Sequence, residues 1–354
     1  MGQVFGESYR ENIIRFAAAR IEKIEALYSA SESRKQGKSS AMDALQPIIK
    51  WHKKYHPDIW DEFSGICQGA NVSPLQLLIA TGYTDVQDYL ANKLQISHPD
   101  YDPGGCTAVV IPAAYSQQGS LLGQTWDMFG DAKQNIVMVK REPDKGLPTL
   151  YFTLMGGLGL IGCNSEGVAI GTTNLTTNDH AAGVNYMFTI SNAFRAGSMN
   201  AAANTITNTT RLAAHNFLLV NEKAGMNIEA NCTDSICTNI DNELYVHTNH
   251  CLSASINATS QCRPYILTES SQYRYDHMTQ LIAAQKELWN MEKCWEILSD
   301  NQRSPGGSAI SVDYDPDNEQ SFETIATILI CPKERRIQIC PGSTRSGKIQ
   351  EFII

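Results

Sequence analysis

The sequence predicts an α+β fold in which helices and antiparallel strands form separate layers. From Glu11 to about Ser97, apolar residues recur every three or four positions, the spacing of helices that bury one face. From Cys106 onward, short apolar runs are separated by turn residues, a pattern typical of strands. Because helices and strands cluster along the chain instead of alternating, we expect antiparallel sheets rather than a parallel βαβ sheet.

The first part of the chain carries two clear helix patterns. Ser73, Pro74 and Gln76 occupy the N-cap, N1 and N3 positions of a capping box, which predicts a helix that runs to Leu90. The polar stretch 31–40 predicts a loop. An earlier helix is indicated by one apolar stripe, made of Ile13, Ile14, Phe16, Ala17, Ile21, Ile24 and Leu27.

The second part begins at segment 98–105, whose Pro, Asp and Gly residues exclude a helix interior. Residues 186–215 and 273–299 are expected to be helical, the latter burying Leu281, Ile282, Leu288 and Trp289. The chain closes on a hairpin, 325–331 with 336–340, and a last strand at 349–354. The other expected strands are 106–111, 121–126, 135–140, 149–154, 168–172, 217–221, 226–231 and 244–248.

Composition and charge exclude several functional classes. The chain has 354 residues, of which 42% are hydrophobic and 18% charged, as in a globular protein with a substantial core. Its net charge is −9 and it has no Lys/Arg run, which argues against nucleic acid or an anionic membrane as partner. No apolar stretch reaches the ~18 residues of a membrane span.

The cysteines and the N-terminus favour a cytoplasmic location. The first residues lack the basic-then-apolar plan of a signal peptide. We therefore interpret most of the ten cysteines as buried or free thiols in a reducing compartment. Five Asn-x-Ser/Thr sequons favour export only weakly, because they arise readily by chance in a chain rich in Asn and Thr: Asn71, Asn174, Asn208, Asn231 and Asn257.

Two patterns point to cofactors or metals, and we reject both. Gly157, Gly159 and Gly162 form a literal GxGxxG, but Cys163–Gly167 is expected to be a turn and a strand follows it, so no helix opens to hold a pyrophosphate. Cys232 and Cys237 lie in a polar β region, farther apart than on a zinc knuckle. His247, His250 and Cys251 follow, and the two histidines would face opposite sides of an extended strand. We therefore expect neither a cofactor nor a metal.

A third pattern places a cysteine where a glycine loop passes into the first strand. Alone, Cys106 after Gly104-Gly105 is more simply a half-buried structural cysteine. Asp127, however, ends the next strand, and a hairpin would bring it beside Cys106. Asn249 lies further along, between two histidines. Without a wider pattern, these two are more simply a turn aspartate and a buried strand amide.

Taken together, these stretches resemble the acyl-coenzyme A:6-aminopenicillanic acid acyltransferases (isopenicillin N acyltransferases) and their relatives in peptidase family C45. These are N-terminal-nucleophile (Ntn) hydrolases. The likeness covers nearly the whole chain in family order, including Gly2-x-x-x-Gly6. Met1 begins almost directly at this element, where relatives carry a leading strand, so we expect a trimmed or short form. The matching stretches are Gly105–Thr107, Gly123–Asp127, Gly159–Ala169 and His247–Leu252.

The resemblance implies an αββα four-layer sandwich preceded by a helical segment, and a precursor that cuts itself between Gly105 and Cys106. Residues 1–105 would become one chain and residues 106–354 the catalytic chain. Cys106 would be the nucleophile, and cleavage would create an α-amine on the same residue, with a pKa near ~8, able to take the thiol proton. Asp127 would orient this amine, and Asn249 would donate to the oxyanion.

The implied activity is an amidase or acyltransferase that forms a thioester on Cys106. The acyl group of a small amide or acyl-CoA would pass to an amine or to water, with the cleaved N-terminal chain as protein partner. A strict amidohydrolase of N-acyl or N-β-alanyl amines remains an alternative, as does a non-catalytic scaffold. One departure supports the scaffold: Gln320-Ser321 stand where the penicillin enzyme has Ser-Arg, and the nearest arginines, Arg335 and Arg336, belong to the hairpin turn.

Overall fold

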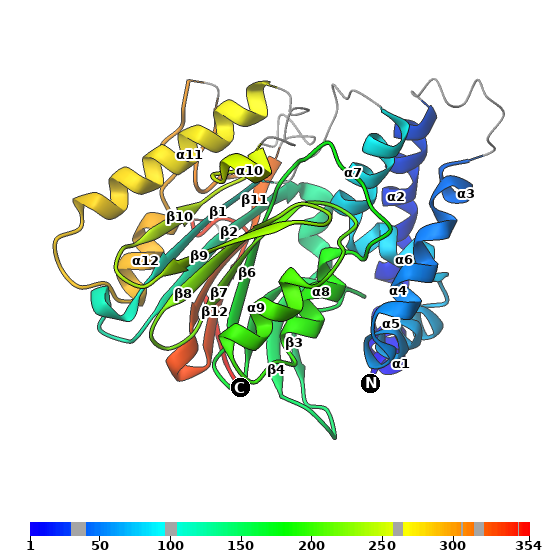
Figure 1. Ribbon diagram of the computed structural model, residues 1–354, viewed down its shortest axis with the longest axis horizontal. Coiled ribbons are helices and arrows are strands. Elements are labelled where there is room, and N and C mark those ends of the chain that lie inside the picture. The colour runs from blue at the N-terminus through cyan, green and yellow to red at the C-terminus, as the bar shows by residue number, and fades with distance from the viewer. Residues whose placement is uncertain (30–39, 96–104, 258–264, 306, 315–321, 346) are drawn as a thin grey trace.

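The described residues up to Gln95 are largely helical, as the apolar spacing predicts. The computed structural model describes residues 1–29, 40–95, 105–257, 265–305, 307–314, 322–345 and 347–354, so the expected loop 31–40 lies almost wholly outside it, as does 98–104. The helices lie together beside the rest of the molecule (Figure 1). They are α1 (Gly2–Ser8), α2 (Arg10–Ser29), α3 (Ala41–Leu45), α4 (Ile49–Tyr55), α5 (Pro57–Ala70), α6 (Pro74–Thr81) and α7 (Tyr83–Leu94), with a 3₁₀ turn at Gln46–Ile48.

The capping box at Ser73 is present, but the helix it opens is shorter than predicted. The Ser73 side chain accepts from the Gln76 amide, and the Gln76 side chain accepts from the Ser73 amide. The helix ends at Thr81 with Gly82 as its C-cap, and a Cβ at Gly82 would lie 2.2 Å from the Asn185 side chain. In the earlier stripe Ile14 is 41% exposed, so the buried face of α2 is narrower than expected.

The rest of the chain forms two antiparallel sheets packed face to face (Figure 1). The first sheet has the order β10-β1-β2-β11-β12-β13 and the second runs from β3 to β9 in chain order. The strands of the first sheet are β1 (Gly105–Ile111), β2 (Leu121–Phe129), β10 (Tyr245–His247), β11 (Phe322–Cys331), β12 (Arg336–Pro341) and β13 (Gln350–Ile353). Those of the second are β3 (Ile136–Arg141), β4 (Thr149–Leu154), β5 (Ile161–Asn164), β6 (Ala169–Asn174), β7 (His215–Val220), β8 (Gly225–Ala230) and β9 (Ser235–Ile240).

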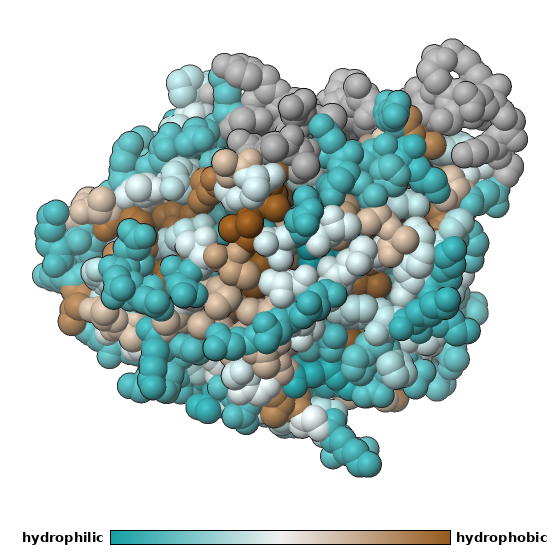
Figure 2. Space-filling view, in the orientation of Figure 1, coloured by the Kyte–Doolittle hydropathy of each residue, from teal (hydrophilic) through white to brown (hydrophobic). Residues whose placement is uncertain are grey.

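Helices cover the outer faces of both sheets and complete four layers. Against the first sheet lie α11 (Tyr265–Ala284) and α12 (Met291–Leu298), and against the second lie α8 (Tyr186–Ala193) and α9 (Met199–Thr207). A short α10 (Ala254–Asn257) follows β10. The predicted α+β fold and αββα sandwich are confirmed. Seen in the orientation of Figure 1, the molecular surface is largely hydrophilic, with apolar residues gathered toward the middle of the view (Figure 2).

Three further sequence predictions are corrected. The expected helix 273–299 is two helices separated by a loop, and Leu288 in that loop is 51% exposed. Residues 186–215 likewise split into α8 and α9, and His215 already begins β7. Cys163 and Asn164 belong to β5 and not to a turn, because the chain reverses only after Asn164, whose side-chain oxygen accepts from the Glu166 and Val168 amides.

The described residues also bear on the metal and membrane expectations. Within the described ranges, no group of three or more His, Cys, Asp or Glu is placed to hold a metal ion. No described helix combines the length and apolar character needed to cross a bilayer. The nine described cysteines are free thiols, and all but Cys237 are buried.

Candidate active site

Cys106 lies at the start of β1, where strand alternation gives each side of its backbone a different environment. Cys106, Ala108 and Val110 belong to the core between the two sheets, whereas Val109 and Ile111 pack in the cluster beneath α11 and α12. The thiol therefore faces the interior of the sandwich. Neighbouring polar groups on the other face reach the Cys106 backbone.

The hairpin formed by β1 and β2 brings Asp127 to the expected place. Gly105 pairs with Asp127 and Cys106 with Trp126 in the antiparallel register. A Cβ at Gly105 would lie 2.9 Å from the Asp127 carboxylate, so this close approach requires glycine. Asp127 accepts a hydrogen bond from the Thr324 hydroxyl at 2.7 Å. Burial raises the pKa of this carboxyl to about 6, although Arg274 and Thr324 favour its charged form.

Asn249 also lies beside Cys106, in the turn after β10. Its side-chain oxygen accepts from the Cys106 backbone N–H at 2.8 Å, and its amide nitrogen donates to the Asn174 carbonyl at 3.1 Å. The backbone N–H of Asn249 donates to the Ser271 hydroxyl at 2.8 Å. The structure thus brings Cys106, Asp127 and Asn249 together from three separate segments.

The turn that carries Asn249 is fixed by a buried acid. His247 and Glu229 lie 2.9 Å apart, and the Glu229 carboxylate also accepts from the backbone amides of Leu252 and Ser253. Hydrogen bonding to His247 and to these amides lowers the Glu229 pKa despite its burial. His247 therefore pairs with Glu229, and this pair helps to hold the turn that carries Asn249.

Sequence reasoning missed the cation of the site, which is Arg274 on α11. Its guanidinium donates to the Cys106 carbonyl, to the Thr107 hydroxyl at 3.1 Å and to the Asn249 side-chain oxygen at 2.8 Å. The side chain is buried. Gln320 and Ser321 lie outside the described residues, but a buried arginine reaches the site from another element. Nothing in the spacing around Arg274 marks it, because the contact joins residues far apart in sequence.

The thiol itself is held in its neutral form. Burial, and secondarily the charge of Asp127, raise the pKa of Cys106 to about 12. Arg274 and hydrogen bonds from the Asn174 backbone and the Gln124 side chain act in the opposite direction. Gln124 also joins the two sheets through hydrogen bonds to the backbone of Thr172. A thiol in this environment would ionise only with the help of a base.

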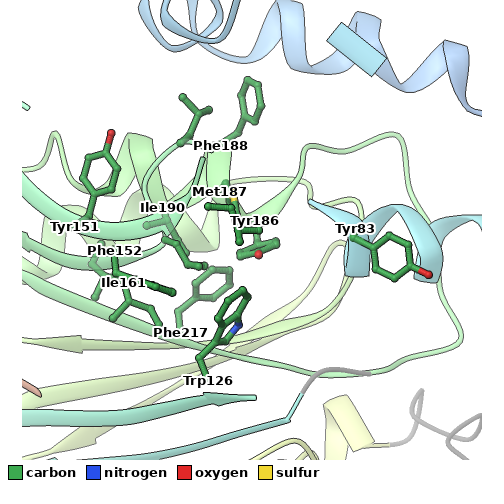
Figure 3. Close-up of a cluster of buried hydrophobic side chains, with 14 of the residues drawn as sticks. Tyr83, Trp126, Tyr151, Phe152, Ile161, Tyr186, Met187, Phe188, Ile190 and Phe217 are labelled. Carbon is green, nitrogen blue, oxygen red and sulfur yellow. The ribbon is translucent and has the colours of Figure 1, made fainter. Parts of the chain in front are cut away.

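A small pocket opens beside the thiol between the two sheets. Cys106 lines it together with apolar walls at Trp126, Met128 and Leu160 and polar walls at Thr84, Thr172, Asn174, Tyr186 and His215. Figure 3 shows Trp126 and Tyr186 lying close together in the adjoining hydrophobic cluster. Thr84 belongs to α7, so the N-terminal segment forms part of this pocket.

Two antiparallel sheets between helical layers are the arrangement of the Ntn hydrolases, which the sequence resemblance predicted. Residues 115–346 match the family described as acyl-coenzyme A:6-aminopenicillanic acid acyl-transferase. The chain belongs to this family, and it is an enzyme of the acyltransferase and hydrolase kind. The match includes Asp127 and Asn249 and begins after Cys106.

The individual relatives have low sequence identity to this chain. The chain is 26% identical over 258 residues to the 40 kDa form of acyl-coenzyme A:6-aminopenicillanic-acid-acyltransferase from Emericella nidulans, covering 71% of this chain and 68% of that protein. A conjugated bile acid hydrolase variant from Clostridium perfringens is 10% identical, with a TM-score of 0.48 over 70% of this chain and 92% of that one. The Caenorhabditis elegans ortholog of N-acylethanolamine-hydrolyzing acid amidase is 12% identical, with a TM-score of 0.45 over 64% of this chain and 93% of that one.

Proposed function

We propose that the protein is a self-cleaving amidase or acyltransferase that forms a thioester on Cys106. The observation that carries this proposal is the set of contacts around the Gly105–Cys106 bond: Asp127 pairs with Gly105, and Asn249 accepts from the Cys106 N–H. Cleavage would separate residues 1–105 from residues 106–354. Both the Gly105–Cys106 processing step and the three catalytic assignments rest on this geometry and on the family.

Cleavage would supply the base that the buried thiol lacks. When Cys106 attacks the Gly105 carbonyl, the peptide bond is exchanged for a thioester, and water then releases Gly105 as a carboxylate. The nitrogen of Cys106 becomes a free amine, whose unperturbed pKa is ~7.7–8.0. It can accept the thiol proton, and its alignment is fixed covalently. The Asn249 oxygen, which accepts from this nitrogen before cleavage, would hold the amine afterwards.

The same groups suit acyl transfer from an external substrate. Cys106 would attack the carbonyl of a small amide or an acyl-CoA, and the leaving amine or thiol would depart with the proton taken from Cys106. The Asn249 amide nitrogen has two hydrogens, of which one is bonded to Asn174, so the other is available to a developing oxyanion. An amine or water would then release the acyl group.

Two features support an enzyme over a non-catalytic scaffold. Arg274 supplies a cation at the nucleophile, which removes the main argument from sequence for a scaffold. The pocket beside Cys106 also has both apolar and polar walls. Transfer and simple hydrolysis use the same thioester, so the choice depends on the acceptor.

The test is the intact mass, under denaturing conditions, of the wild type beside Cys106→Ala. We expect wild-type fragments of roughly 11.6 and roughly 27.5 kDa, scaled by length from the 39.1 kDa chain, and an uncut variant. Fragments in both proteins would mean that another group or a protease cuts the chain. A single mass of 39.1 kDa in both would contradict self-cleavage.

A further inference from the structure

A histidine–aspartate pair lies at the pocket beside Cys106 and has no part in the chemistry described above. His215 lines the pocket from β7, where it pairs with Asn174 of β6. Its ring nitrogen Nε2 lies 2.5 Å from the carboxylate of Asp85, which is completely buried on α7. The pair therefore joins the catalytic sandwich to the N-terminal helical segment.

The contacts of this pair fix the ring in one orientation. The second carboxylate oxygen of Asp85 accepts from the Tyr186 backbone N–H at 2.8 Å. The Tyr186 ring stacks on the His215 ring, with centroids 4.3 Å apart and planes inclined by 26°. Asp85 is thus held by two donors, and it holds the imidazole by Nε2. This arrangement orients a side chain for a task at its other nitrogen.

The other ring nitrogen, Nδ1, is buried and has no hydrogen-bond partner among the described residues. His215 as a whole is 2% exposed. Buried polar atoms are almost always satisfied, so an unpaired one at a pocket wall requires an explanation. A buried, charged N–H without an acceptor costs more than an unpaired lone pair. When the ring donates from Nε2 to Asp85 in its neutral form, Nδ1 carries a lone pair that can accept a hydrogen bond.

We propose that His215, oriented by Asp85, determines specificity by accepting a hydrogen bond from an O–H or N–H group on the acyl part of the substrate. The inference rests on the proposed function, since it takes Cys106 as the nucleophile that shares this pocket. The apolar walls at Trp126, Met128 and Leu160 would hold the carbon skeleton. The substrate class is thus a short acyl group that bears a hydroxyl, amino or amide N–H.

The test compares three p-nitrophenyl esters, which acylate a reactive thiol and release a coloured phenolate: the butanoate, the 3-hydroxybutanoate and the 3-methoxybutanoate. The methoxy ester has the oxygen of the hydroxy ester but cannot donate. We expect the wild type to favour the hydroxy ester over the butanoate about tenfold in kcat/KM, the size of one hydrogen bond, and to show no such preference for the methoxy ester.

Variants then assign the preference to the pair. His215→Phe is expected to lose the preference for the hydroxyl, so that its kcat/KM values for the hydroxy ester and the butanoate become about equal. Asp85→Asn, which keeps the shape of the side chain, should weaken the same preference and serves if His215→Phe does not fold. His277→Phe is the matched control: His277 also contacts an aspartate, Asp300, at 2.8 Å and stacks on a tyrosine, but it does not line the pocket. Its ratio between esters should equal that of the wild type.

The outcomes separate this inference from the function beneath it. Ester turnover that Cys106→Ala abolishes, but that shows no hydroxyl preference, would overturn the inference alone. An equal loss of all three esters in His215→Phe would assign His215 a structural role and would also overturn it. Turnover unaffected by Cys106→Ala would overturn the proposed nucleophile, and the inference with it.

Discussion

Replacing Arg274 by Met tests whether the buried cation of α11 serves the reaction. The substitution keeps a long side chain and removes the hydrogen bonds to the Cys106 carbonyl, the Thr107 hydroxyl and the Asn249 side chain. It also removes the positive charge that favours the ionised form of Asp127, so the pKa of that carboxyl should rise further above 6. Both changes affect the groups that surround the Gly105–Cys106 bond.

The size of the effect follows from the contacts. A hydrogen bond to a charged group contributes about 1.5–3 kcal/mol. If only the bond to Asn249 matters for turnover, its loss at about 2 kcal/mol lowers kcat/KM about 30-fold. If the bond to the Cys106 carbonyl also matters, the decrease approaches about 10³-fold. Arg274→Lys should fall between the wild type and Arg274→Met, because an ammonium keeps the charge without the planar donor set.

The assay is p-nitrophenolate release from p-nitrophenyl butanoate, measured beside thermal unfolding of each variant. Arg211→Met provides a matched control. Arg211 is also buried and donates to the backbone carbonyls of Asn231, Ile206, Thr209 and Asp234, outside the site. It should lower the melting temperature with little change in kcat of the folded protein. Wild-type kcat/KM in a folded Arg274→Met protein would refute the reasoning.

Two further predictions concern stability. The pKa of Asp127 is raised from 3.8 to about 6, so folding disfavours its charged form. The contribution of Asp127 to the free energy of unfolding is therefore fully present below pH ~4 and is lost as the pH rises through about 6. Asp127→Asn removes this cost and should raise the free energy of unfolding by about 3 kcal/mol at pH 8 and by little at pH 4 in urea titrations; equal changes at both pH values would contradict this. Gly69→Ala should destabilise the protein by about 1–3 kcal/mol, because its Cβ would lie 2.1 Å from the Gln3 carbonyl. Gly197→Ala, with nothing within 4 Å, should leave the melting temperature nearly unchanged, and a similar shift for both glycines would rule out the clash.

Local patterns predicted the parts of the fold that local forces decide. The capping box at Ser73 formed as expected because its bonds join residues three apart. The hairpin that places Asp127 near Cys106 is made of two strands that follow each other along the chain, joined by residues 112–120. The close approach of Asn185 to Gly82, between α6 and α7, could not be predicted, because it joins residues from distant parts of the chain.

The same distinction applies to the site. The identities of Cys106, Asp127 and Asn249 came from ordered motifs, and the structure brings these residues together. Arg274 lies 168 residues from Cys106 on a helix whose sequence has no matching motif, so only the packing of α11 on the first sheet reveals it. Asp85 and His215 were missed for a similar reason: they are 130 residues apart and lie on opposite sides of the expected cleavage point.

The two environments of β1 have a consequence for how this enzyme can change. The groups that contact the Cys106 backbone, Arg274 and Asn249 among them, are distinct from most residues that line the pocket at its thiol. Under the proposed function, we therefore expect substitutions at Met128 or Leu160 to change the choice of acyl group and to leave self-cleavage intact. New acyl specificities would then be accessible by single substitutions, and a library restricted to those wall positions is a direct way to search for them.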